Sequence, residues 1–248
     1  MKIAILTLFP EMFDSFLGCS IIGRARQEGL LTIQPVDIRP FSEKKHQNAD
    51  DYPYGGGAGM VMLAQPVCDA VRAVRGRGFS GPCIYVSPRG KPLTQRKVRE
   101  LSREDGLVLV CGHYEGLDQR AVELVVDEEI SLGDFVLTGG ELAAMALTDA
   151  VARYVPGVLG SGESAEEESF SDGLLEYPQY TRPRVYGGLE VPEVLVNGDH
   201  AKIRAWRRQQ ALIATLRTRP DLFACAPMTD KERAATLQAA RKEDPPCC

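Results

Sequence analysis

The chain has 248 residues, of which 44% are hydrophobic and 25% charged, and its formal net charge is −5. This profile is that of an ordinary soluble globular protein, and no stretch reaches the roughly 18 apolar residues that a membrane helix needs. Seven cysteines without a Cys-x-x-Cys pair indicate reduced thiols in a cytoplasm, which disfavours a disulfide framework and a zinc site.

Residues 1 to about 160 alternate strand and helix patterns. Short apolar runs predict strands at 2–8, 31–38, 83–87 and 107–112. Helical patterns are expected at Ile21–Glu28, Pro66–Arg75, Thr94–Leu101, Asp118–Leu124 and Glu141–Tyr154, the last with Leu142, Met145, Ala146 and Asp149 on one face. Apolar strands that alternate with helices predict an α/β fold, with a parallel sheet flanked by helices and ligands bound at the carboxyl ends of its strands.

The remainder of the chain separates its charges. Residues 161–176 carry six acidic side chains and no basic one, with much Ser and Gly, and predict a flexible acidic linker. Residues 177–248 read as a small, mostly helical domain, whose stretch 200–219 contains six Lys and Arg and no acid. Such a helix is either a solvated face or, together with Arg182 and Arg184 before it, a contact for RNA phosphates.

The stretch YGGGAGM at 54–60 poses the question of a phosphate cradle. Its spacing fits neither G-x-x-x-x-G-K-[ST] nor G-x-G-x-x-G, and Asp50 and Asp51 just before it repel phosphate. Two interpretations stay open: a tight turn, or a loop whose amides approach a neutral ligand such as a base. Two further glycine loops, at 112–116 and 132–140, are expected on the same edge of the sheet, so the three together predict a ligand pocket.

Several motifs in order carry a family resemblance. They are LTLFPEMF (6–13), DDYPYGGGAGM (50–60), YVSPRG (85–90), LVCGHYEGLDQR (109–120), SLGDFVLTGGELAAM (131–145), EYPQYTRP (176–183) and GDHAKIRAWR (198–207). This ordered set resembles the bacterial tRNA (guanine-37-N1)-methyltransferases, a family of the knotted SPOUT class. The resemblance covers nearly the whole chain and fades in about the last 25 residues.

The resemblance implies a deep trefoil knot in a methyltransferase domain at 1–160, followed by the linker 161–176 and a tRNA-binding domain at 177–248. It also implies S-adenosylmethionine as cofactor, dependence on Mg²⁺ without a protein metal site, and a homodimer whose subunits share the active site. The expected partners are tRNA and a second copy of the chain, not DNA or a membrane. The implied cofactor-binding residues are Tyr85, Val86, Pro88, Gly112, Tyr114, Glu115, Leu132, Gly133, Asp134, Phe135, Val136, Leu137, Gly139 and Gly140.

Methylation of guanine N1 needs a base, because N1 carries a proton at neutral pH, and a cation or donor for the charge that develops on O6. The family places an Asp just before Ser-Phe as base; Glu168 stands there in this chain, with Glu167 and Asp172 as competing neighbours. Arg153 matches the arginine that faces O6. The expected substrate contacts are Asp50, Gly59, Ser164, Ser169, Arg182, Arg204 and Arg208. Alternatives are methylation of another RNA, a non-catalytic RNA-binding relative, and an unrelated nucleotide-binding α/β protein.

Overall fold

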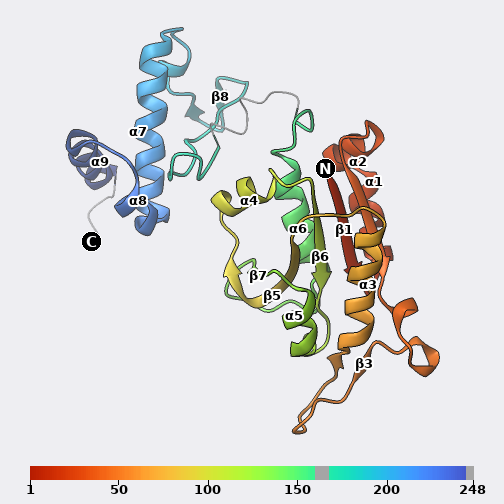
Figure 1. Cartoon of the computed structure of the whole chain (residues 1–248). Helices are drawn as coiled ribbons and strands as arrows, with labels where there is room; N and C mark the ends of the chain where they lie inside the picture. Colours follow the sequence, from red (N-terminus) through yellow and green to blue (C-terminus); the bar gives the residue numbers. More distant parts are fainter. Residues whose placement is uncertain (160–167, 244–248) are drawn as a thin grey trace. The chain divides into compact units, whose positions relative to one another are not determined.

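The computed structural model describes residues 1–159 and 168–243, and the chain forms two compact units, Met1–Gly162 and Glu163–Cys248 (Figure 1). The first unit is an α/β structure, and helices dominate the second. Residues 168–176, which we expected to belong to a linker, are part of the second unit, where Leu174 is buried in the core. Among the described residues, no helix is long and apolar enough to cross a bilayer.

A five-stranded sheet with the order β2-β1-β6-β5-β7 forms the centre of the first unit, and every pair of neighbouring strands is parallel. The predicted parallel sheet flanked by helices is therefore confirmed. The register places Lys2 opposite Thr32 on one side and opposite Gly106 on the other. The strands are β1 (Lys2–Thr7), β2 (Thr32–Asp37), β5 (Cys83–Pro92), β6 (Gly106–Cys111) and β7 (Glu128–Ser131).

Alternate residues of the central strands face two separate hydrophobic cores, because side chains of a strand point to opposite faces. Ile3, Ile5 and Leu109 face one core, whereas Ala4 and Val108 face the other. The first core is covered by α1 (Asp14–Gly18), α2 (Ser20–Gln27), α4 (Gln95–Leu101) and α6 (Glu141–Ala152), and the second by α3 (Ala64–Gly76) and α5 (Gln119–Val125). Both faces of β6 are buried, which explains its uninterrupted apolar sequence.

The predicted apolar face of α6 is wrong. Ala143, Ala144 and Leu147 are buried, whereas Leu142 is 54% exposed and Asp149 is exposed. The helix carries apolar residues all around, so its sequence gives two candidate faces and the sheet beneath it decides between them.

Strand β7 was not predicted. Asp127, Glu128 and Glu129 interrupt its apolar pattern, and it is the edge strand beside β5. Two of the acids have partners: Asp127 Oδ2 accepts the Cys83 amide at 2.8 Å, and Glu128 pairs with Lys97 at 2.5 Å. Among the described residues, Glu129 Oε2 is buried without a hydrogen-bond partner. An edge strand with charged, paired side chains is common in natural sheets.

The second unit packs around a long helix, α7 (His200–Thr218), with α8 (Pro220–Cys225), α9 (Asp230–Glu243) and the hairpin of β8 (Val185–Tyr186) and β9 (Leu189–Glu190). Its core contains Leu174, Leu212 and Phe223. The side chains of Thr229 and Glu232 form a reciprocal cap before α9. The remaining elements are β3 (Asp50–Asp51), β4 (Val61–Met62) and the short 3-10 helices Pro10–Phe13, Arg39–Phe41, Lys45–Gln47 and Glu193–Leu195.

The cysteines of the described residues should differ sharply in reactivity. Burial raises the pKa of the Cys83 thiol to about 12 and also raises the pKa values of Cys68 and Cys111, so their thiolates are scarce at pH 8. Cys19 and Cys225 are exposed. Treatment of the native protein with Ellman's reagent, followed by peptide mass mapping, should modify Cys19 and Cys225 within minutes and leave the buried three unmodified. Rapid modification of Cys83 would contradict this core assignment.

Candidate active site

A cavity of about 240 Å³ lies at the carboxyl ends of β5, β6 and β7, where a parallel sheet places its ligands. Three loops line it: residues 86–89 within β5, residues 112–117 after β6 and residues 132–140 after β7. The loops are tied together, since the Gly140 amide donates to the Gly112 carbonyl at 2.8 Å and His113 forms a β-bridge with Gly139. The glycine loops at 112–116 and 132–140 thus share one sheet edge, as predicted.

Nearly all of the expected cofactor residues line this cavity. They are Tyr85, Val86, Pro88, Gly112, Tyr114, Glu115, Leu132, Gly133, Phe135, Val136, Leu137, Gly139 and Gly140. Asp134 is the exception: it belongs to the same loop but does not line the cavity. Ile130 and Ser131 at the end of β7, and Ala143 on α6, line it as well and were missed. Ile130 and Ser131 could be predicted as lining residues only after β7 had been recognised as a strand.

Two glycines of the cavity wall are required by close packing. A Cβ atom on Gly112 would lie 2.8 Å from the Tyr85 hydroxyl oxygen. One on Gly140 would lie 2.8 Å from the Cys111 Cα and from the Gly112 amide nitrogen. Separations under 3.0 Å are not tolerated by a Cβ without displacement of its neighbours, and backbone atoms yield least. The absent side chains at these positions therefore let the two loops approach each other.

The lining favours a ligand without phosphates. Arg89, Glu115 and His113 are its ionisable groups besides two tyrosines, so one arginine is the permanent cation. Most of the surface is backbone and apolar side chain, which suits a heterocycle recognised by amides and carbonyls. Burial raises the pKa of the Tyr85 phenol, which stays neutral at physiological pH.

Tyr114 connects the cavity to the hairpin of β3 and β4. Its backbone is left-handed, with φ of 57°, a conformation that non-glycine residues adopt rarely. Its phenol hydrogen-bonds to the carboxylate of Asp50 on β3. Burial is the main cause that raises the pKa of Tyr114, and the negative charge of Asp50 raises it further. The expected substrate contact Asp50 is therefore held by a residue that lines the cavity.

The glycine stretch forms the tip of this hairpin, which projects from the first unit (Figure 1). Gly55, Gly56, Gly57 and Gly59 all have positive φ, so the tight-turn interpretation is confirmed. Close approach also occurs: a Cβ on Gly59 would lie 2.5 Å from Oε1 of Glu115. A cavity-lining carboxylate thus occupies the space beside Gly59.

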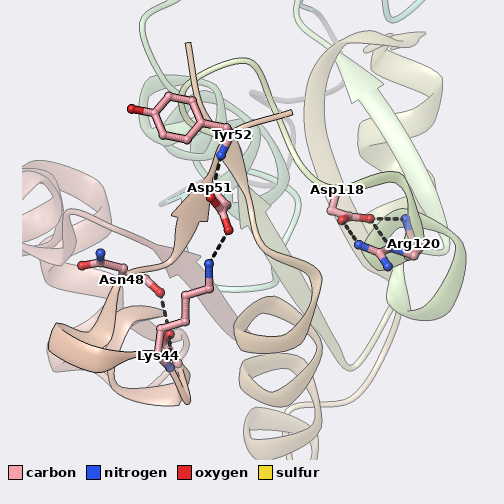
Figure 2. Close-up of polar contacts among 7 residues, drawn as sticks. Lys44, Asn48, Asp51, Tyr52, Asp118 and Arg120 are labelled. Carbon is pink, nitrogen blue, oxygen red and sulfur yellow. Dashed lines mark hydrogen bonds and ion pairs between the residues drawn. The ribbon is translucent and has the colours of Figure 1, made fainter. Parts of the chain in front are cut away.

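Ion pairs fix the base of the hairpin. Figure 2 shows Lys44 Nζ beside Asp51 Oδ2, at 2.5 Å, with the Tyr52 amide donating to the same carboxylate. It also shows Asp118, the N-cap of α5, bound by the Arg120 guanidinium. The hydrogen bond from Lys44 lowers the Asp51 pKa, and that from Arg120 lowers the Asp118 pKa. The Glu115 amide donates to the Met60 carbonyl, so the hairpin and the cavity loop are joined directly.

The proposed base and its neighbours lie in the second unit. Glu168 lines a cavity of about 230 Å³ together with Asp172, Arg204 and Arg208. Arg208 is bound internally, to Glu232 at 3.1 Å and to the Pro227 carbonyl at 2.6 Å.

The other predicted site residues are placed as follows. Ser169 accepts the Glu176 amide through its hydroxyl at 3.0 Å. Arg182 lines a further cavity of the second unit, beside α7. Arg153 is the C-cap of α6 in the first unit. Ser164 and Glu167 lie outside the described residues. Within the described segments, no group of three or more His, Cys, Asp or Glu is placed to hold a metal ion.

Comparison with known proteins gives the same result as the ordered motifs. The model of the family described as tRNA (Guanine-1)-methyltransferase TrmD matches residues 1–225. The chain belongs to this family. Several curated tRNA (guanine-N(1)-)-methyltransferases are similar to this TrmD-family chain over most of its length. The protein of Moorella thermoacetica is 53% identical over 98% of both chains. That of Clostridium perfringens strain 13 is 58% identical over 90% of this chain and 93% of the relative. That of Carboxydothermus hydrogenoformans is 55% identical over 96% of this chain and 93% of the relative.

Proposed function

We propose that the protein transfers a methyl group from S-adenosylmethionine to N1 of guanosine-37 in tRNA. The observation that carries this proposal is the match to the TrmD family over residues 1–225, which includes all three loops of the cavity. Relatives that are 53–58% identical to this chain are tRNA (guanine-N(1)-)-methyltransferases. A cytoplasmic location, the deep trefoil knot and a homodimer with a shared active site form part of the same proposal.

The cavity fits S-adenosylmethionine, which carries no phosphate. The loops at residues 86–89, 112–117 and 132–140 would hold it, with Glu115 as the carboxylate nearest to a positively charged ligand. When bound, the cofactor supplies an activated methyl group on a sulfonium, so no covalent enzyme intermediate is needed. The glycines at positions 112 and 140 keep the walls of the cavity close together.

The remaining tasks fall to residues of the chain. Glu168 removes the N1 proton as general base, and the Arg153 guanidinium stabilises the charge on O6. Asp50, held by Tyr114, and Gly59 contact the guanines, together with Ser164 and Ser169. Arg182, Arg204 and Arg208 bind the tRNA backbone in the second unit.

Methyl transfer to defined transcripts tests the function. Purified protein is incubated with radiolabelled S-adenosylmethionine and a tRNA transcript that has guanosine at positions 36 and 37, and the modified nucleoside is mapped by mass spectrometry. We expect N1-methylguanosine at position 37 and no transfer when that base is adenosine. Transfer only to another RNA would assign a different substrate, and cofactor binding without any transfer would assign a non-catalytic role.

Substitution of Gly59 by alanine should weaken S-adenosylmethionine binding about tenfold, because the new Cβ displaces the Glu115 carboxylate. Gly55→Ala is the matched control: φ is +88° there and +87° at Gly59, but no atom lies within 4 Å of its Cβ position. Isothermal titration calorimetry measures S-adenosylmethionine affinity for both variants and for Gly59→Ala in a Glu115→Ala background. The comparison separates the clash between the new Cβ and Glu115 from backbone strain at position 59. Equal losses in the two single variants would show that strain alone matters.

A further inference from the structure

The cavity that contains Arg182 has a volume of about 610 Å³ and lies wholly within the second unit. Its walls are the extended segment 177–184, the residues around the helix Glu193–Leu195, and the first half of α7. The groove contains no residue of the cofactor cavity and no residue assigned to guanine, and Arg182 is the residue assigned to the tRNA backbone that lines it. The mechanism proposed above leaves its purpose open.

Aromatic rings occupy one side of this groove. The Tyr180 and Trp206 rings lie 6.3 Å apart between centroids and are tilted by 54°, so they do not close onto each other. Tyr180 is 48% exposed. The Arg207 guanidinium lies over the Tyr177 ring at 4.8 Å from its centroid, which adds a flat cationic surface beside the rings. Flat surfaces of this kind bind the faces of nucleobases with little preference for sequence.

The charges of the groove are of one sign. Three arginines line it, Arg182, Arg184 and Arg207, and none of the described residues that line it is acidic. Arg184 is held by Glu190 at 2.8 Å, whereas Arg182 is exposed and makes no ion pair with the side chains described in residues 168–240. The cavity beside Glu168 shares Arg207 with the groove but differs from it, because three acidic side chains line that cavity together with its three arginines. An anionic ligand is therefore favoured in the groove next to Trp206.

We propose that this groove binds one unpaired nucleotide of the RNA substrate, with its base against Trp206 and Tyr180 and its phosphate on Arg182. The inference rests on the proposed function for the identity of the RNA. Inside a duplex, stacked neighbours cover both faces of a paired nucleobase, so the nucleotide must come from a loop or an end of the RNA. The groove then selects RNA with an accessible unpaired base, independently of the guanine that is methylated.

Trp206 is the only tryptophan of the chain, so its fluorescence reports on this groove directly. Titration of the full-length protein with a tRNA transcript should quench the emission at saturation, and a blunt RNA duplex of similar length should quench it far less. Tyr180→Ala should weaken tRNA binding about 5- to 150-fold, the range for loss of one stacked base, while Trp206→Phe, which keeps a ring, should weaken it less.

Arg182→Gln should weaken tRNA binding more than Lys231→Gln, an exposed α9 residue with the same change in charge. Circular dichroism checks that each variant folds. Bound tRNA, shown by gel shift, without any change in Trp206 emission would overturn the groove assignment, as would equal losses in the two charge variants. Quenching by an acidic peptide but not by RNA would assign the groove to a protein partner and also overturn the proposal. Methyl transfer by the wild type is measured alongside, so that failure of the groove and failure of the proposed function remain distinct.

Discussion

Replacement of Glu168 by glutamine is expected to lower methyl transfer to guanosine-37 by about 10²- to 10⁴-fold, the range for loss of a general base. Glutamine keeps the size of the side chain and loses the proton acceptor. S-adenosylmethionine binding should stay unchanged, because Glu168 belongs to the second unit and does not line the cofactor cavity. Single-turnover rates with saturating cofactor measure the chemical step, and calorimetry measures the affinity.

Two control variants make this result specific. Asp172→Asn removes a carboxylate from the same cavity and should reduce the rate less than tenfold. Glu168→Asp restores the residue that the family uses and should keep most of the activity, although its carboxylate is one methylene shorter. A larger loss at Asp172 than at Glu168 would transfer the role of base to Asp172, and full activity of Glu168→Gln would remove Glu168 from the mechanism.

Gly140→Ala should weaken S-adenosylmethionine binding by at least tenfold and lower the free energy of unfolding by about 1–3 kcal/mol, the usual cost of overpacking. The φ of Gly140 is −80°, so alanine adds no backbone strain and the effect is steric. The added Cβ would meet the backbone of Cys111 and Gly112 at 2.8 Å and Cγ2 of Val86 at 2.9 Å. Urea unfolding and calorimetry with the cofactor measure the two effects.

Gly76→Ala serves as the control, since Gly76 ends α3 and has no atom within 4 Å of its Cβ position. We expect no loss of affinity there, and a gain in stability of up to about 1 kcal/mol from helix propensity. If Gly140→Ala binds the cofactor as tightly as Gly76→Ala, the loops 112–117 and 132–140 do not need to touch in order to form the pocket.

The elements that could be predicted from the sequence are those with a clear apolar pattern that charged residues do not interrupt. Strands β1 and β6 are apolar and buried on both faces, so their composition identifies them. Strand β7 escaped prediction because the three acids at 127–129 break its apolar pattern. Two of these acids meet partners that are distant in sequence, since Glu128 pairs with Lys97 and Asp127 accepts the amide of Cys83. The face of α6 was assigned wrongly for a related reason: an apolar helix fits the sheet on several sides, and packing selects one.

The candidate site follows the same division. Its loops were predictable, because glycine-rich segments after buried strands meet at one edge of a parallel sheet. The individual contacts were not predictable, because they depend on how the loops fold back. Asp134 does not line the cavity. The Glu115 carboxylate lies beside Gly59, in a hairpin more than fifty residues earlier in the chain. Such approaches leave no local trace in the sequence other than the glycine itself.

The position of β1 in the sheet has a consequence for how the chain is made. It is the first strand to be synthesised, yet it lies between β2 and β6, and Lys2 pairs with Gly106. One edge of a largely apolar strand therefore stays unpaired during synthesis until about a hundred further residues have been added. Strands that pair in parallel with partners distant in sequence fold slowly, and their unpaired, aggregation-prone edges stay exposed until pairing is complete. Translation pauses before β6 has left the ribosome should lengthen that exposure, and pauses after β6 has paired with β1 should not.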